Sequence, residues 1–185
     1  MTKAEADGLF HPNCRHAFSL YIPDNPYRGL TEEYLTRAAE HINEMDEDEK
    51  KSFISQLAKR AGQPYNPDIK SGDEIYYDNN SEPIYPPNGG AYWPQKEAIL
   101  KAGTRVDRYG RPDGRFLAPA GTSFAERALP KTEDPASKPS VYVTLRDVRV
   151  LQGITMPWFG QSGGGVQYQL SKKVKSMKDD FAEVK

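Results

Sequence analysis

The stretch that decides the fold class is TRVDRYGRPDGRFLA, residues 104–118. It contains two short runs suited to β-structure, Thr104–Tyr109 and Arg115–Ala118. Between them lie Gly110 and Pro112, and these two residue types mark turns because of their unusual backbone preferences. The pattern therefore predicts short strands separated by turns, as in a small antiparallel sheet.

The same pattern continues toward the C-terminus. Three further runs predict strands, at Val141–Leu145, Val148–Leu151 and Val166–Leu170. Ser123–Leu129 predicts one or two helical turns. Residues 63–94 are rich in proline and glycine and predict neither a strand nor a helix.

Residues 30–62 follow a different period and predict a helical hairpin. Apolar residues recur there at helical spacing, with Thr31 and Asp46 placed as N-caps and Gly62 as the stop. Together with the strand pattern, this predicts an α+β fold: a small antiparallel β core with an N-terminal helical hairpin extension.

Three segments are predicted along the chain. Residues 1–80 form an irregular N-terminal segment and the hairpin, and residues 81–172 form the β core. Residues 173–185 are a charged tail that forms a short helix or frays.

Composition excludes several classes of protein. The chain has 185 residues, and no apolar run approaches the length of a membrane span. A single cysteine, Cys14, excludes a disulfide framework. Residues 1–75 hold 9 Lys/Arg and 14 Asp/Glu, whereas residues 76–185 hold 16 and 12. This weakly basic second part suits a small phosphate-bearing ligand better than a nucleic acid, so no nucleic-acid partner is predicted.

Common catalytic and metal-binding patterns are not met. His11, Cys14 and His16 are too closely spaced on a proline-containing loop for a tetrahedral metal cage, so no metal is predicted. All the histidines, the last being His41, precede the glycine-rich part of the chain, which argues against a Ser–His–Asp triad. The acidic run at residues 46–49 is better explained as a helix start than as a cation site.

Two features of the β core could bind a ligand. Arginines lie close together with aromatic residues, which suits a diphosphate beside a stacked ring, although the same arginines could equally form an exposed edge paired with nearby acids. The glycine-rich stretch Gly160–Tyr168 could be a plain hairpin loop or a place where the backbone approaches a ligand. The arginines are Arg105, Arg108, Arg111, Arg115 and Arg127.

Three ordered motifs carry a resemblance to a known family. They are YPPNGG at residues 85–90, DRYGRPDGRFLAPAGTSFAERALP at residues 107–130 and PWFGQSGGGVQYQ at residues 157–169. In this order they resemble the TNT domain family, named for the tuberculosis necrotizing toxin, which includes fungal surface NADases and bacterial antagonism effectors. The resemblance covers residues 85–170.

The resemblance implies an NAD⁺ glycohydrolase that cleaves NAD⁺, and NADP⁺ as well, into nicotinamide and the ADP-ribose product. NAD⁺ is then the substrate, and no cofactor is expected. By motif, the implied catalytic residues are Arg108, Arg127 and Gln167. The implied substrate-binding residues are Arg115, Phe116, Tyr109, Trp158 and Gln161. Some members also use a histidine after the ERALP segment, which this chain lacks.

The family also implies a setting. The N-terminus has no apolar signal region, so the expectation is a secreted effector exported by a non-classical route that acts in the target-cell cytoplasm. A cognate immunity protein occluding the site is the expected partner. Two alternatives stay open: a nucleotide- or RNA-binding module that stacks bases on its aromatic residues, and a mono-ADP-ribosyltransferase. The second would need an acid, and Glu126 is the only one in the ERALP segment.

Overall fold

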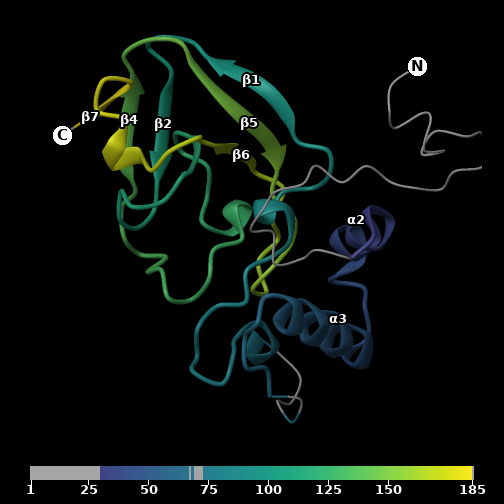
Figure 1. Ribbon diagram of the computed structural model, residues 1–185. Coiled ribbons are helices and arrows are strands. Elements are labelled where there is room, and N and C mark those ends of the chain that lie inside the picture. Colours follow the sequence, from purple (N-terminus) through teal and green to yellow (C-terminus); the bar gives the residue numbers. More distant parts are fainter. Residues whose placement is uncertain (1–29, 67, 69–72, 185) are drawn as a thin grey trace, which may run out of the picture.

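The computed structural model describes residues 30–66, 68 and 73–184 and combines a seven-stranded sheet with a pair of helices (Figure 1). In Figure 1 the sheet lies at the upper left and the helices at the lower right. This arrangement confirms the predicted α+β class.

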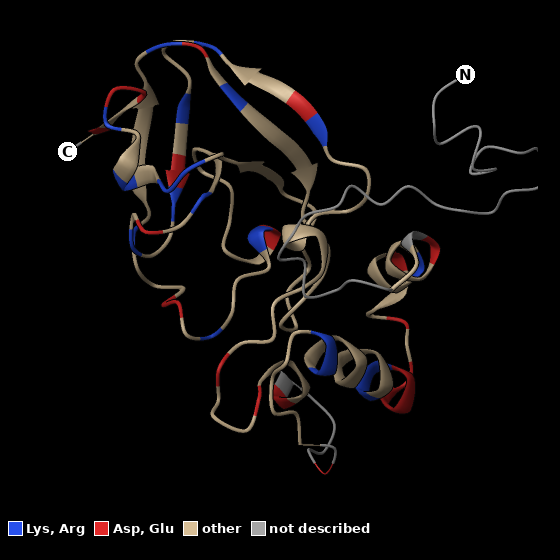
Figure 2. Ribbon diagram, viewed as in Figure 1, with Lys and Arg blue, Asp and Glu red and all other residues tan. Residues whose placement is uncertain are grey.

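The helical hairpin forms where the capping residues place it. Helix α2 spans Glu32–His41, and the Thr31 hydroxyl accepts a hydrogen bond from Tyr34 N at 3.2 Å. Helix α3 spans Glu47–Arg60, and the Asp46 carboxylate accepts from two main-chain N–H groups of its first turn. The first turn of α3 is acidic and its last turn is basic (Figure 2), so its charges complement the helix dipole.

The sheet is antiparallel throughout, with strand order β1-β5-β6-β3-β2-β4-β7. Strand β3 joins its two halves: Phe116 and Leu117 pair with β6, and Ala118 and Pro119 pair with β2. The strands are β1 Lys96–Leu100, β2 Arg105–Arg108, β3 Phe116–Pro119, β4 Ser140–Thr144, β5 Val148–Ile154, β6 Val166–Gln169 and β7 Phe181–Val184.

The five predicted strands are confirmed, and two edge strands were missed. Strand β1 lies at one edge and β7 at the other. The prediction of a short helix or a frayed end for the charged tail holds only for the 3₁₀ turn at Val174–Ser176. It is wrong for the last residues, because β7 pairs with β4 and Phe181 is buried. Only one residue of β7 is buried. The segment therefore lacks the alternation of apolar and polar residues by which a strand is predicted from sequence.

Short 3₁₀ turns supply the remaining structure. Ala125–Arg127 forms η3 within the predicted helical stretch. Two more turns, η1 at Asp73–Tyr76 and η2 at Asn88–Gly90, fall where no element was predicted, and a fourth, η4, spans Val174–Ser176.

Two groups of buried side chains hold the molecule together. One lies within the sheet and includes Val106, Leu117 and Phe181. The other joins the helices to the β region through Phe53 and Trp158, whose ring centroids are 5.9 Å apart. Full burial of a large apolar side chain stabilises a protein by about 1.5–3 kcal/mol.

The second core spans the predicted boundary between residues 80 and 81. Tyr76 packs against Trp158 with ring centroids 5.1 Å apart. The Trp158 indole N–H also donates to the Ile84 carbonyl at 2.8 Å. The hairpin and the sheet therefore share one packed interior.

Candidate functional site

One face of the sheet brings together two of the predicted site residues, Phe116 and Gln167. Phe116 of β3 lies directly opposite Gln169 of β6, and Gln167 lies two residues earlier on the same strand. Side chains two apart on a strand point to the same face. We call this surface, with Phe116, Gln167 and Gln169, the site face.

The turn η2 lies against the site face. The Gln167 amide nitrogen donates to the Gly89 carbonyl oxygen at 2.8 Å. A Cβ atom on Gly89 would lie 3.3 Å from both the Phe116 ring and the Gln169 amide oxygen, and Gly89 has a φ of +62°. The position therefore favours glycine, which lets the YPPNGG motif approach the QYQ motif closely.

Arg108, at the end of β2, fastens the loop that leads to Phe116. Its Nε donates to the Arg111 carbonyl at 2.7 Å, and its Nη1 donates to the Phe116 carbonyl at 2.9 Å. Burial lowers the pKa of Arg108, and the nearby Glu133 carboxylate opposes that shift. Two of the predicted site residues, Arg108 and Phe116, are thus in direct contact.

Arg127 is enclosed by protein groups. Its side chain is 8% exposed and forms an ion pair with the carboxylate of Asp107, which is 2% exposed. Its Nε also donates to the Thr122 carbonyl at 2.9 Å, and the guanidinium lies 5.1 Å from the centre of the Tyr109 ring. Arg127 therefore supports the segment that holds Asp107 and Tyr109, and only a small part of it faces solvent.

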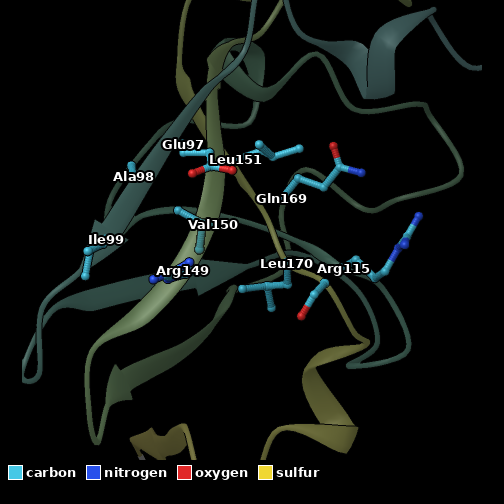
Figure 3. Close-up of a pocket in the computed structure, with 10 residues that line it drawn as sticks. Glu97, Ala98, Ile99, Arg115, Arg149, Val150, Leu151, Gln169 and Leu170 are labelled. Carbon is cyan, nitrogen blue, oxygen red and sulfur yellow. The ribbon is translucent and has the colours of Figure 1, made fainter. Parts of the chain in front are cut away.

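Arg115 is exposed and borders a hollow of about 580 Å³. Figure 3 shows its side chain extending to the same side as those of Gln169 and Leu151. Arg149 of β5 supplies a second positive charge to the lining. Among the predicted arginines, Arg115 is placed to offer its guanidinium to an anion.

Two predicted substrate-binding residues lie elsewhere. Trp158 is 0% exposed and packs in the core shared with the helices, so it does not line the site in this structure. Gln161 closes the turn after Trp158, where its main-chain N–H donates to the Trp158 carbonyl at 2.8 Å.

Two acidic side chains, Glu126 and Glu133, lie close to the predicted arginines. Glu126 forms a reciprocal cap with Ser123, and these hydrogen bonds lower the pKa of the Glu126 carboxyl. A Cβ atom on Gly110 would lie 2.6 Å from the Glu133 carboxylate, which places that acid beside the DRYG turn near Arg108. Glu133 was not among the predicted site residues, because its loop carries no distinctive sequence pattern.

Gln169 and Gly89 were also not among the predicted site residues. The signal for Gln169 was available, because it is two positions after Gln167 on a predicted strand and shares its face. Gly89 could be placed only by the fold, since it meets Gln167 across 78 positions of sequence.

The histidine and cysteine cluster near the N-terminus falls largely outside the described residues. His41 lies in α2, and its Nδ1 contacts Glu44 at 3.0 Å. Within the described ranges, no group of three or more His, Cys, Asp and Glu side chains could hold a metal ion. In the same ranges, no helix has the length and apolar character needed to cross a bilayer.

The antiparallel sheet of this α+β fold thus places the amides of Gln167 and Gln169 and the ring of Phe116 on one face, and Arg115 borders the hollow beside Gln169. Residues 99–182 match the family model described as tuberculosis necrotizing toxin. The matched residues overlap residues 85–170, over which the sequence motifs resemble the TNT domain family.

A relative and two solved structures are similar to the chain. The conidial surface nicotinamide adenine dinucleotide glycohydrolase nadA of Aspergillus fumigatus is 34% identical over 55% of this chain and 48% of its own length. The chain thus spans about half the length of this relative. The structure of tuberculosis necrotizing toxin complexed with its immunity factor IFT matches at 19% identity, covers 69% of this chain and 79% of that one, and has a TM-score of 0.47. Rhs1-CT in complex with its cognate immunity protein RhsI1 matches at 21% identity, with 51% and 80% covered and a TM-score of 0.41.

Proposed function

We propose that the TNT domain of this chain is an NAD⁺ glycohydrolase that also accepts NADP⁺. The observation that carries the proposal is the meeting of Gln167, Gln169 and Phe116 under the Gly89 turn, beside Arg108 and Arg115. The TNT family match and the identity to a fungal glycohydrolase support the same activity.

The reaction suits a site built from amides and arginines. Hydrolysis breaks the bond between ribose C1′ and the pyridinium nitrogen, whose electron pair stays with nicotinamide. Nicotinamide therefore leaves as a neutral molecule without needing a proton, unlike the leaving group of most glycosidases. Water adds to C1′, and one proton is released to solvent.

Two kinds of group would act on the transition state. The carbonyl dipoles of Gln167 and Gln169 stabilise positive charge on the ribose and orient its hydroxyl groups or the attacking water. An amide does not titrate near neutral pH, so neither glutamine serves as a general base. Phe116 forms an aromatic wall for the nicotinamide ring, because flat rings stack favourably.

The arginines divide into supporting and contacting roles. Arg115 binds the diphosphate with a planar guanidinium, which forms paired charged hydrogen bonds with phosphate oxygens. Arg108 fixes the carbonyl of Phe116 and adds positive charge nearby. Arg127 holds Asp107 through an ion pair and Tyr109 through a cation–π contact.

The transferase alternative has less support from the geometry. Glu126, the acid of the ERALP segment, already binds the Ser123 N–H at 2.8 Å in the reciprocal cap. If Glu126 turned to position an acceptor, its hydrogen bond to Ser123 would break and the turn that carries Arg127 would lose its cap.

A biological role follows from the family description as a toxin. We propose that the chain is secreted by a non-classical route and depletes NAD⁺ in the cytoplasm of a target cell. A producer of such an activity needs protection, so a cognate immunity protein that occludes the site face is the expected partner. No cofactor is expected, since NAD⁺ is the substrate.

The test is a turnover assay with NAD⁺ at neutral pH without added metal, with nicotinamide and ADP-ribose quantified by chromatography. Replacing Gln167 by alanine lowers kcat by at least about 10²-fold, the usual effect of losing one preorganised polar group. Gln152→Ala is the matched control, because Gln152 is exposed and pairs with Tyr168, so it belongs to the opposite face. Intact NAD⁺ with the folded wild-type chain, or equal turnover by Gln167→Ala, would overturn the proposal.

A further inference from the structure

Strands β5 and β1 extend the site face beyond Gln167 and Gln169. Gln167 lies opposite Gly153 of β5, and Gln169 lies opposite Leu151. The next β5 residue on this face is Arg149, which lies opposite Ile99 of β1. Strand residues rise by about 3.3–3.4 Å, so Arg149 lies roughly 13 Å along the strand from the position of Gln167.

The hollow beside Gln169 occupies this second part of the face. It is lined by Arg115, Gln169, Leu151 and Arg149 (Figure 3). The groups proposed to act on the nicotinamide ribose thus lie at one end, and Arg149 lies at the other.

Arg149 is suited to hold an anion at that end. It is exposed, and among the described residues its guanidinium has no ion-pair partner within 4.0 Å. The nearest acid in the lining is Glu97, which lies opposite Leu151 and therefore one step away on the neighbouring strand. With Arg115 included, the lining carries two positive charges and one negative charge.

Two exposed apolar side chains lie beside Arg149 and offer a surface on which a purine ring could pack. Leu151 is 40% exposed and Ile99 is 52% exposed, and both lie on the same face as Arg149. Exposed apolar groups beside a charged anchor favour a ligand that combines a flat ring with a phosphate.

We infer that this hollow binds the adenosine end of the dinucleotide and that Arg149 binds the 2′-phosphate of NADP⁺. The inference rests on the proposed function, because it places the reacting ribose at Gln167. Arg115 then meets the diphosphate between the two ends. The chain discriminates between the two dinucleotides through Arg149, which finds a phosphate in NADP⁺ and only a hydroxyl group in NAD⁺.

The test compares kcat/KM for NADP⁺ and NAD⁺ in the wild type and in Arg149→Gln. Losing one charged, paired hydrogen bond to phosphate lowers kcat/KM for NADP⁺ by at least about tenfold. The value for NAD⁺ changes by less than about threefold, as for a surface substitution. Arg37→Gln, at an exposed position of α2, is the matched control and leaves both values unchanged.

Failure of the inference and failure of the proposed function give different results. An Arg149→Gln variant that loses both substrates equally, or neither, would overturn the inference alone. A wild type that cleaves NAD⁺ but not NADP⁺ would overturn the inference and the NADP⁺ part of the proposed function, and would leave the NAD⁺ glycohydrolase activity standing. A wild type that cleaves neither dinucleotide would overturn the proposed function. In that case the Kd of NADP⁺, measured by calorimetry, decides the inference. The inference stands if Arg149→Gln raises the Kd of NADP⁺ at least about tenfold, and it falls if the Kd is unchanged.

Discussion

Arg108 and Arg127 donate hydrogen bonds to main-chain carbonyl groups next to the site. Arg108 binds the carbonyls of Arg111 and Phe116, and Arg127 binds that of Thr122. A guanidinium has five N–H donors in a rigid fork, so one arginine can fix several parts of a loop at once. At these two positions, arginine shapes the backbone that presents Phe116 and Tyr109.

The pair Arg127–Asp107 gives the sharpest stability prediction for a single residue. Arg127→Ala leaves the buried Asp107 carboxylate without its partner and lowers the free energy of unfolding by about 3–5 kcal/mol. Adding Asp107→Asn removes the orphaned charge and recovers part of this loss, which urea denaturation of both variants would measure. Equal stability of the single and double variants would contradict the prediction.

Activity should respond to the same substitution. In Arg127→Ala that remains folded at low temperature, turnover of NAD⁺ falls by at least about 10²-fold, because the electrostatic environment of the site is disrupted. Near-normal turnover by the folded variant would show that Arg127 contributes stability alone.

At the scale of elements, the loop between β2 and β3 determines where Arg108 points. Gly114 lies directly against the Arg108 guanidinium, and a methyl group there would collide with Nη2. The atom that must move is the end of a flexible side chain, so the backbone can stay in place. Gly114→Ala is therefore a means of displacing Arg108 without deleting its charge.

We predict that Gly114→Ala reduces kcat/KM for NAD⁺ to nearly the level of Arg108→Ala, and that its melting temperature falls no further than that of Arg108→Ala, because both variants lose the same hydrogen bonds. The double variant should be no worse than Arg108→Ala alone, because both substitutions act on one side chain and such effects are not additive. Steady-state kinetics of the three variants provides the check. Additive losses in the double variant would mean that Gly114 acts independently of Arg108.

Strands β5 and β1 show how much of the sheet could be predicted from the sequence. Strand β5 was predicted from its alternation of buried Val148 and Val150 with exposed neighbours, a local signal. Strand β1 is mostly exposed and carries lysine and glutamate, so its pairing with β5 depends on tertiary context. Residue types and motif order pointed to Gln167 and Phe116, but only the strand register places them with Gln169.

Trp158 shows the limit of motif reasoning. Its position next to the glycine-rich segment suggested a contact with the ligand, yet the side chain turns into the core and donates to the Ile84 carbonyl. An aromatic residue in a motif can serve either role, and sequence spacing does not say on which side of the chain a core will form. The partner of Trp158 is 74 positions away, beyond the reach of local patterns.

At the scale of the whole molecule, the question is whether the helical hairpin and the sheet unfold as one unit. The sequence predicted a boundary between residues 80 and 81, whereas the core formed by Phe53, Tyr76 and Trp158 crosses it. Elements that share fully buried aromatic side chains cannot separate without exposing them to water, at a cost of about 1.5–3 kcal/mol each. The shared core therefore favours a single cooperative transition.

Phe53→Ala tests this coupling from the side of the helices. Removing a buried phenylalanine costs about 3–5 kcal/mol, and if the core is shared the sheet loses stability by the same amount. Denaturation curves from far-UV circular dichroism, which follows the whole backbone, and from tryptophan fluorescence should coincide and shift together. Leu145→Ala is the control, because Leu145 is 53% exposed and its truncation changes stability by less than about 0.5 kcal/mol. Two separate transitions, with only the first moved by Phe53→Ala, would mean that the hairpin is an appendage and that the sheet supports the site face without it.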